Sequence, residues 1–178
     1  MKQVSFLFLI VLIFSCTNIE QEEVFEEYQG PVSELHDIDM HFIDSSRVIV
    51  RMVTPTQLVY QDENKKYPEE VKLWFYDKQE NISTTVRGDS GKYTRSKNTY
   101  TLMGNVKIFN PNKQETMLTQ EFDWYPDYEE IRSDSAVTVR TPTQVIYGKG
   151  FIAKQDFSEY TLKKIVRSVL EVPDLPSK

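Results

Sequence analysis

The chain has 178 residues, 39% hydrophobic and 27% charged, which is ordinary for a globular protein and too short for two domains of normal size. A net charge of −6 and a pI near 5.1 give no electrostatic support to nucleic-acid or phosphate binding. We therefore expect one acidic domain with a single core and no nucleic-acid partner.

The N-terminus has the pattern of an export signal. Lys2 supplies a positive charge, and an apolar run over residues 4–14 follows it. A transmembrane helix needs about 20 apolar residues, and this run is about half as long, which fits the apolar region of a secretory signal. We predict a signal peptide over residues 1–15.

Cys16 is the only cysteine, so an internal disulfide is impossible. The stretch "IFSC" (13–16) resembles a bacterial lipobox, although Phe14 is bulkier than the usual residue there. We expect cleavage before Cys16 and lipid attachment to it; a plain secreted protein with an incidental cysteine is the alternative. We predict that residues 16–31 form a solvated acidic tether. Its acidic residues are Glu20, Glu22, Glu23, Glu26 and Glu27.

The body of the chain predicts strands. Only residues 32–42 have apolar spacing that fits a short helix. In "YTLMGNVKI" (100–108) and "MLTQEFDWY" (117–125), apolar and polar residues alternate, and the turn sequence "NPNKQ" between them predicts a hairpin. We predict further strands over residues 47–54, 71–77, 82–87, 136–140, 145–152 and 160–170, with turns at "DENKKYP", "RGDSGK" and "YPDYEE". Because strands alternate with turns, an antiparallel sandwich or open barrel is expected.

One phrase occurs twice: "TPTQLVY" at residues 54–60 and "TPTQVIY" at residues 141–147. Proline cannot donate a ladder hydrogen bond and belongs at a strand edge, end or bulge. We interpret each copy as a bend between two strands of a repeated hairpin layout, with chance similarity as the alternative.

No motif indicates catalysis. The two histidines, His36 and His41, lie near three aspartates, but their spacing matches no regular ligand pattern. A thiol nucleophile is excluded if Cys16 is lipidated, and no nucleophile elbow, P-loop or zinc-protease motif occurs. The sequence therefore predicts no enzyme, no metal site and no cofactor.

Two stretches, "DSSRVIVRMVTPTQLVY" (44–60) and "YPEEVKLWFYD" (67–77), resemble the opening strands of the LptC family, the periplasmic component of lipopolysaccharide export. The likeness spans about residues 43–169. Many members have a true transmembrane helix at the N-terminus, whereas this chain has a short apolar run and Cys16. The most specific matches are Leu102-x-Gly104-x-Val106, Leu118 leading to Trp124, Ile131-x-Ser133-Asp134 with Val137, Gly148-x-Gly150-Phe151 and Asp156-Phe157-Ser158.

The resemblance implies an all-β fold, a twisted open antiparallel β-jelly-roll over residues 32–172, followed by a tail over 173–178. It further implies that the protein accepts lipopolysaccharide from an inner-membrane ABC transporter with LptB, LptF and LptG-like subunits. An LptA-like bridge protein would receive the lipid next. The expected location is the periplasm of a Gram-negative bacterium, as a lipoprotein anchored in the inner membrane.

The resemblance and the alternation together predict two sets of site residues. The even-numbered faces of the hairpin would line a lipopolysaccharide-binding groove, and the first and last strands would dock partners. A structural adaptor lipoprotein with a closed β-sandwich is the alternative, and an LptA-like soluble bridge unit is a third possibility. The groove set is Leu102, Val106, Ile108, Leu118, Phe122, Trp124, Val137 and Val139; the edge set is Val48, Val50, Met52, Leu162, Val166 and Leu170.

Overall fold

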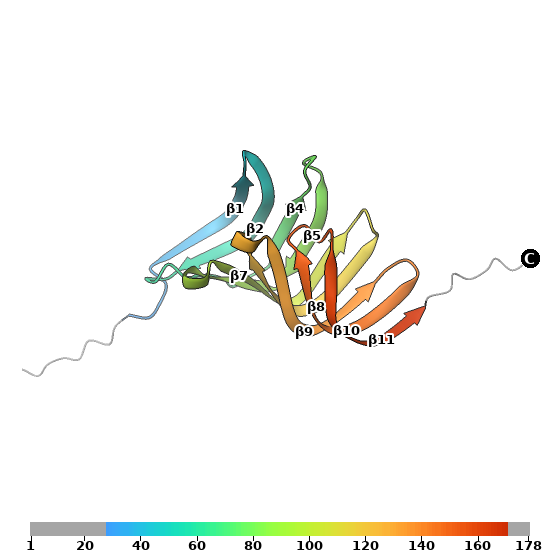
Figure 1. The fold of residues 1–178 in the computed structure, drawn as a ribbon. Coiled ribbons are helices and arrows are strands. Elements are labelled where there is room, and N and C mark those ends of the chain that lie inside the picture. The colour runs from blue at the N-terminus through green and yellow to red at the C-terminus, as the bar shows by residue number, and fades with distance from the viewer. Residues whose placement is uncertain (1–27, 171–178) are drawn as a thin grey trace, which may run out of the picture.

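Strand follows strand through residues 28–170, which are the residues described by the computed structural model (Figure 1). The predicted signal peptide, Cys16, most of the tether and the tail lie outside this range. Two short 3₁₀ turns, η2 (Arg95–Lys97) and η3 (Pro126–Tyr128), interrupt the strands. The strands are β1 (Ser33–Asp44), β2 (Arg47–Val59), β3 (Lys65–Tyr67), β4 (Val71–Tyr76), β5 (Ile82–Gly88), β6 (Ser90–Thr94), β7 (Thr99–Asn110), β8 (Glu115–Tyr125), β9 (Glu130–Arg140), β10 (Gln144–Lys154) and β11 (Tyr160–Leu170).

All strands belong to one antiparallel sheet, which confirms the predicted all-β, jelly-roll-like fold class. β3 and β4 pair in succession with β2, and β5 and β6 pair in succession with β7. Each of these couples acts as one interrupted ribbon, so the eleven described strands form nine ribbons that run up and down in chain order. Within the described residues, β1 pairs only with β2 and β11 only with β10, so these two are the edge strands.

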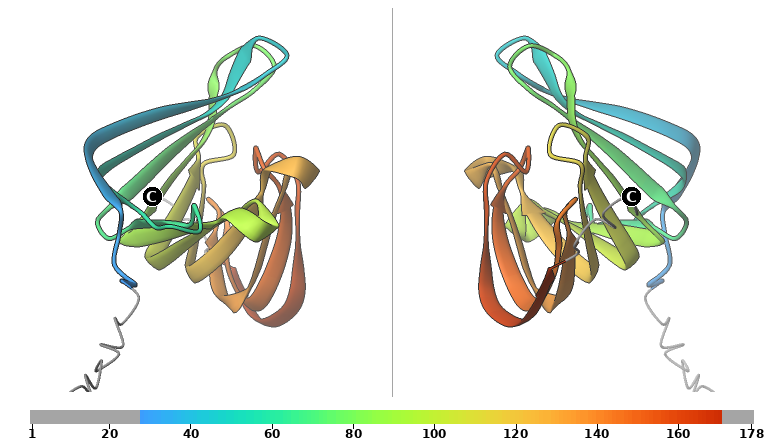
Figure 2. Two further views of the ribbon diagram at one scale, coloured as in Figure 1. Left: turned by 90° about the vertical axis from the view of Figure 1, so that its left-hand side faces the viewer. Right: turned by 90° about the vertical axis from the view of Figure 1, so that its right-hand side faces the viewer.

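The sheet is folded in two along a line that we call the crease (Figure 2). Each ribbon from β1 to β10 is interrupted near its middle, where pairing registers shift or residues are left unpaired. Bulges of this kind bend a strand and increase its twist. The crease passes through residues 37 and 55, the breaks at 68–70 and 89, and residues 104–105, 120–121, 134–135 and 150.

The crease divides the sheet into two facing halves. Half A carries η2, η3 and the β10–β11 turn, and half B carries the β1–β2, β4–β5, β7–β8 and β9–β10 turns. Aromatic side chains from both halves meet in the core. The Trp124 ring of half A lies 5.8 Å from the Phe75 ring and 4.9 Å from the Phe42 ring, both of half B. Burial also raises the pKa of Tyr100, which packs against Trp124, to about 12.

The predicted helix over residues 32–42 is wrong, because this segment is strand β1. Ile38, Met40 and Phe42 alternate as a strand requires, and all three are half-buried. Asp37 has a left-handed φ of 54° at the crease and interrupts the alternation. The interruption places Leu35 three residues before Ile38, which imitates helical spacing. The predicted turns "DENKKYP" and "RGDSGK" likewise contain β3 and part of β6.

The two copies of the repeated phrase differ in structure. The second copy follows β9 and turns at residues 141–143 into β10, as predicted. The first copy forms no such hairpin, because β2 continues through it to Val59. Pro55 lies at the crease, where pairing passes from Thr54 opposite Ile38 to Thr56 opposite His36. The missing proline N–H is therefore placed where the β1–β2 ladder is already interrupted.

Candidate functional site

The surface between the two halves is the candidate site, and it contains most of the predicted groove residues. Seven of the eight side chains are buried there: Leu102, Val106, Ile108, Phe122, Trp124, Val137 and Val139. Strands β7, β8 and β9 supply these residues and place them side by side. They come together as one apolar cluster that extends from β2 to β10.

Leu118 is the exception, and its predicted inward orientation is wrong. Its side chain is 37% exposed on the outer face, while Met117 and Thr119 point inward. β8 crosses the crease with one residue fewer than its neighbours, so the inward positions change from odd to even between Thr119 and Phe122. The prediction that even-numbered residues face inward along the whole of β8 is therefore correct only beyond the crease, from Phe122 onward.

The interior of the isolated chain is packed. Trp124 is only 1% exposed, and Phe75 and Phe122 are equally inaccessible. The large apolar side chains thus fill the space between the halves and do not line an open groove along it. Such packing stabilises the fold by roughly 25 cal/mol for each Å² of apolar surface removed from water.

A cleft opens at the rim, where the ends of the two halves approach each other. Its volume is about 360 Å³. Half B lines it with residues from the β1–β2 and β4–β5 turns, and half A with η3 and the β10–β11 turn. Phe75 belongs both to this cleft and to the buried core, so the cleft reaches the edge of the apolar interior.

The β10–β11 turn, residues 155–159, spans the rim, and we call it the clasp. Phe157 of the clasp is 2% exposed and inserts between the halves, with its ring 6.0 Å from that of Phe75 and 6.4 Å from that of Phe122. On half B, the Thr84 hydroxyl donates a hydrogen bond to the Asp156 carbonyl at 3.0 Å. The clasp therefore closes the interior at this point.

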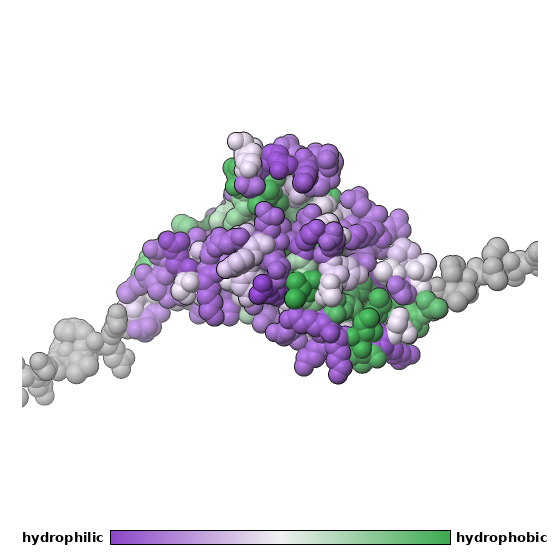
Figure 3. Space-filling model, viewed as in Figure 1, coloured by the Kyte–Doolittle hydropathy of each residue, from purple (hydrophilic) through white to green (hydrophobic). Residues whose placement is uncertain are grey.

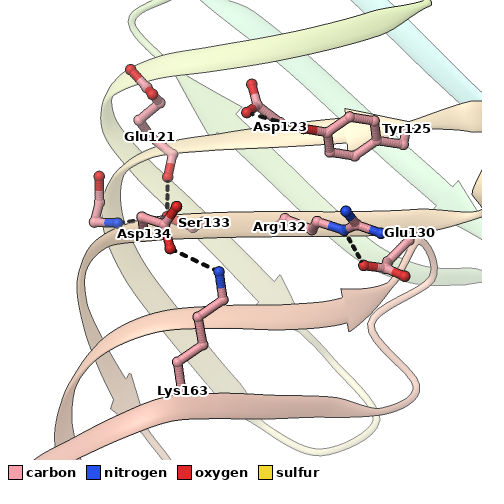
Figure 4. A network of polar contacts seen from close by, with 9 residues as sticks. Glu121, Asp123, Tyr125, Glu130, Arg132, Ser133, Asp134 and Lys163 are labelled. Carbon is pink, nitrogen blue, oxygen red and sulfur yellow. Dashed lines mark hydrogen bonds and ion pairs between the residues drawn. The ribbon is translucent and has the colours of Figure 1, made fainter.

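Polar groups stabilise the crease where strands β8 and β9 cross it side by side (Figure 4). The Ser133 hydroxyl donates to the Glu121 carbonyl at 2.5 Å and accepts from the Ser135 amide at 3.1 Å. These bonds satisfy backbone groups that the shifted registers leave without a ladder partner. On the outer surface, the Lys163 ammonium lies 2.7 Å from the Asp134 carboxylate and lowers the pKa of that carboxyl.

The predicted N-terminal docking edge is misplaced. Val48, Val50 and Met52 lie in β2, an internal strand that pairs with β1 on one side and β4 on the other. Val50 and Met52 are buried in the core. The edge strand at this end is β1, which was predicted as a helix and so could not be considered as an edge.

The C-terminal strand β11 is an edge, and apolar side chains gather over this end of the molecule (Figure 3). Leu162 is half-buried against the core, whereas Val166 is 67% and Leu170 75% exposed. Val166 stands at a register shift, where Ile165 pairs with Gly148 and Arg167 with Tyr147. As a result, Ile165 and Val166 are consecutive exposed apolar residues.

The polar residues weighed for metal binding or catalysis do not converge. His36 approaches Glu34 and His41 approaches Asp39, all on the exposed face of β1. Within residues 28–170, no three histidine, cysteine or acidic side chains are grouped as metal ligands would be. The same part of the chain contains no helix of the length and hydropathy needed to cross a membrane.

Sequence reasoning missed the contributions of Phe42 and Phe157 to the interior. Phe42 was missed because its segment was predicted to be a helix, although its spacing of two residues from Met40 is typical of a strand. Phe157 lies in a turn between two strands, where alternation carries no information. Phe75, by contrast, lies in a predicted strand and could have been included from its alternation with Leu73.

Comparison with known families identifies the protein. Residues 6–171 match the family model described as "LptC: Lipopolysaccharide-assembly, LptC-related". No curated protein matches the chain. The family consists of lipopolysaccharide-transport components of the Gram-negative envelope, which are not enzymes and which act with transporter and bridge partners. Since the match covers nearly the whole chain and the fold agrees with it, the chain belongs to the LptC family.

Proposed function

We propose that the protein accepts lipopolysaccharide from the inner-membrane ABC transporter, with LptB, LptF and LptG-like subunits, and passes it to an LptA-like bridge protein. The observation that supports this role most is the continuous apolar surface between the halves, which extends across the sheet toward both edge strands. Acyl chains inside such a surface would be shielded from water as they pass.

An apolar interior suits passage because it binds acyl chains without a strongly preferred position. Each buried CH₂ group gains about 0.8 kcal/mol wherever it lies in an apolar environment. Movement between similar surfaces is then nearly level in free energy, and the transporter's ATPase supplies direction. The adaptor alternative shares the packed interior seen here, but family membership supports lipid cargo.

Photocrosslinking tests the cargo directly, using two neighbouring residues of β7. Val106 faces the interior and Lys107 faces solvent. A photoreactive residue at position 106 should capture lipopolysaccharide in the assembled exporter, while the same group at position 107 should give little adduct. A third position, Leu118, should behave like Lys107 because the crease turns it outward. Equal labelling at all three positions would refute an interior route.

We further propose that Cys16 carries the membrane anchor, with residues 16–31 as the tether. The support is the short apolar run and the lipobox-like "IFSC". A multiply acylated cysteine provides the two chains that stable attachment requires. Cys16→Ala should accumulate uncleaved precursor and abolish fatty-acid labelling, as followed by gel mobility. Normal processing and membrane attachment of the variant would exclude this anchor.

We also propose that the edge strands dock partners by strand addition, β1 with the transporter's periplasmic domain and β11 with the bridge protein. Edge strands expose unpaired ladder groups, which are a template for pairing with a strand of another chain. Val166→Asp should weaken capture of the bridge protein strongly and leave the fold intact, because the side chain is exposed. Retained transporter capture is the control; loss of both contacts by a folded variant would contradict the end-to-end arrangement.

A further inference from the structure

The clasp over residues 155–159 inserts Phe157 between the halves, where the proposed function places acyl chains. We propose that it is an autoinhibitory contact in which Phe157 acts as an internal surrogate for an acyl chain, and that lipid enters only when the clasp withdraws. This inference rests on the proposed function, because it assumes that acyl chains pass between the halves.

The backbone of Phe157 is in an unusual conformation. Its φ is 53°, in the left-handed region that bulky residues seldom adopt. Such a conformation persists where local contacts impose it, and here the Phe157 backbone amide donates a hydrogen bond to the Lys154 carbonyl at 2.9 Å. The turn itself sets this φ, so the turn can keep its shape when the ring withdraws. The same backbone hydrogen bond and a left-handed φ recur at five other turn residues: Glu63, Glu80, Asn98, Gln114 and Glu129.

The clasp holds the halves together through few contacts, most of them at the rim. On half B, the Thr84 hydroxyl donates to the Asp156 carbonyl at 3.0 Å. The Ser83 hydroxyl lies 3.4 Å from the same carbonyl but closer, at 3.1 Å, to the Phe75 carbonyl of β4. The Lys113 ammonium, from the β7–β8 turn, donates to the Ser158 carbonyl at 2.6 Å. These are side-chain contacts to a turn, not a ladder, so the turn can release them without unpairing the strands of half B.

On half A the clasp is linked to the central tryptophan. The Trp124 indole N–H donates to the Gln155 side-chain oxygen at 3.2 Å. The Gln155 backbone N–H donates to the Glu129 backbone carbonyl at 2.8 Å. Withdrawal of the clasp would therefore remove the hydrogen-bond partner of Trp124. Tryptophan emission can report this change.

The rim cleft lies directly outside the clasp. Gln155 and Asp156 form part of its wall, and Phe75 lies where the cleft meets the core. Phe75 and Phe122 are the rings that Phe157 contacts. When Phe157 leaves, these two rings become an apolar surface continuous with the cleft. The ligand class that fits this surface is a flexible hydrocarbon chain of an amphiphile whose head remains at the rim.

Hydrogen exchange of the full chain with lipid A in detergent micelles tests the proposal, with the detergent alone as reference. Binding should speed exchange in a peptide covering residues 154–160, while peptides of β7 and β8 become better protected. In a Trp74→Phe background, which leaves Trp124 as the only tryptophan, emission should shift to shorter wavelength on binding, because the indole N–H loses its acceptor and hydrocarbon replaces the clasp beside it.

Variants separate release of the clasp from simple loss of packing. Thr84→Val removes the hydrogen bond from half B to the Asp156 carbonyl and so loosens the clasp with little change in core volume. It should raise the apparent affinity for lipid A several-fold, because the apparent affinity is the intrinsic affinity multiplied by the fraction of molecules whose clasp is open. Phe151→Ala removes a fully buried ring from the same cluster, outside the clasp contacts described above, and it should give no such gain. Phe157→Ala should raise the apparent affinity in the same direction as Thr84→Val.

Three outcomes decide the proposal. Faster exchange in the clasp together with tighter binding by the loosened variants supports it. Unchanged or slower clasp exchange with normal lipid crosslinking at Val106 overturns the clasp and leaves the proposed function intact. Absence of crosslinking at Val106 in wild type and loosened variants overturns the proposed function, and the clasp proposal with it.

Discussion

Trp124→Ala is expected to lower the free energy of unfolding by about 3–5 kcal/mol, the usual cost of removing a large buried aromatic side chain. Its ring contacts Phe42, Phe75 and Tyr100, so the substitution leaves a cavity between the two halves. Whole domains are stable by only about 5–15 kcal/mol, and the loss would be a large part of that. Urea unfolding followed by circular dichroism measures it.

The other tryptophan provides the matched control. Trp74 lies half-buried on the outer face of β4, with the Arg51 guanidinium 5.3 Å from its ring centre. Trp74→Ala removes a similar side chain and this cation–π contact, so a loss of about 1 kcal/mol is expected. If both variants lost equal stability, the central role of Trp124 in joining the halves would be incorrect.

Gly150→Val is expected to destabilise the fold by roughly 3 kcal/mol, the upper end of the cost for a residue forced into a sparsely populated conformation. Gly150 has a φ of 70° at the crease, where β-branched residues are strongly disfavoured. A Cβ there would also lie 3.0 Å from the Ser133 carbonyl oxygen of β9. Thermal and urea unfolding should both report the loss.

Gly150→Asn separates the two causes of this loss. Asparagine tolerates the left-handed region better than valine, but it brings the same Cβ toward Ser133. We expect a smaller loss for asparagine than for valine. Lys149→Val, at the exposed neighbouring position, should change stability by about 0.5 kcal/mol or less. Equal losses for asparagine and valine would show that backbone conformation is not the cause.

The sequence predicts those features of the fold that depend on the local pattern of a single strand or hairpin. The β7–β8 hairpin follows from alternation and a turn sequence, and the inward orientation of Val106, Phe122 and Trp124 agrees with it. The all-β class follows because the same pattern recurs along the chain. Strand bounds were mostly too short, since half-exposed strand ends lose the apolar signal.

The crease could not be predicted, because it depends on neighbouring strands together. The orientation of Leu118 depends on how many residues β7 and β9 place opposite β8 at the crease. The interruption of β1 at Asp37 likewise gave this strand the apolar spacing of a helix. As a result, the edge strand was wrongly expected at β2. The burial of Phe157 depends on the meeting of the two halves, which no local pattern describes.

The crease also limits how the length of these strands can change. β8 and β10 each cross the crease with one residue fewer than the neighbouring strands β7 and β9. Only with this difference do the inward side chains of all four strands stay aligned on both sides of the crease. Deleting Gln120 alone would put the two parts of β8 out of step and exchange Met117 with Leu118 as the inward side chain. A deletion could be compensated only by matching deletions in adjoining strands. Related chains should therefore differ in length at the turns and keep the residue count of each strand across the crease.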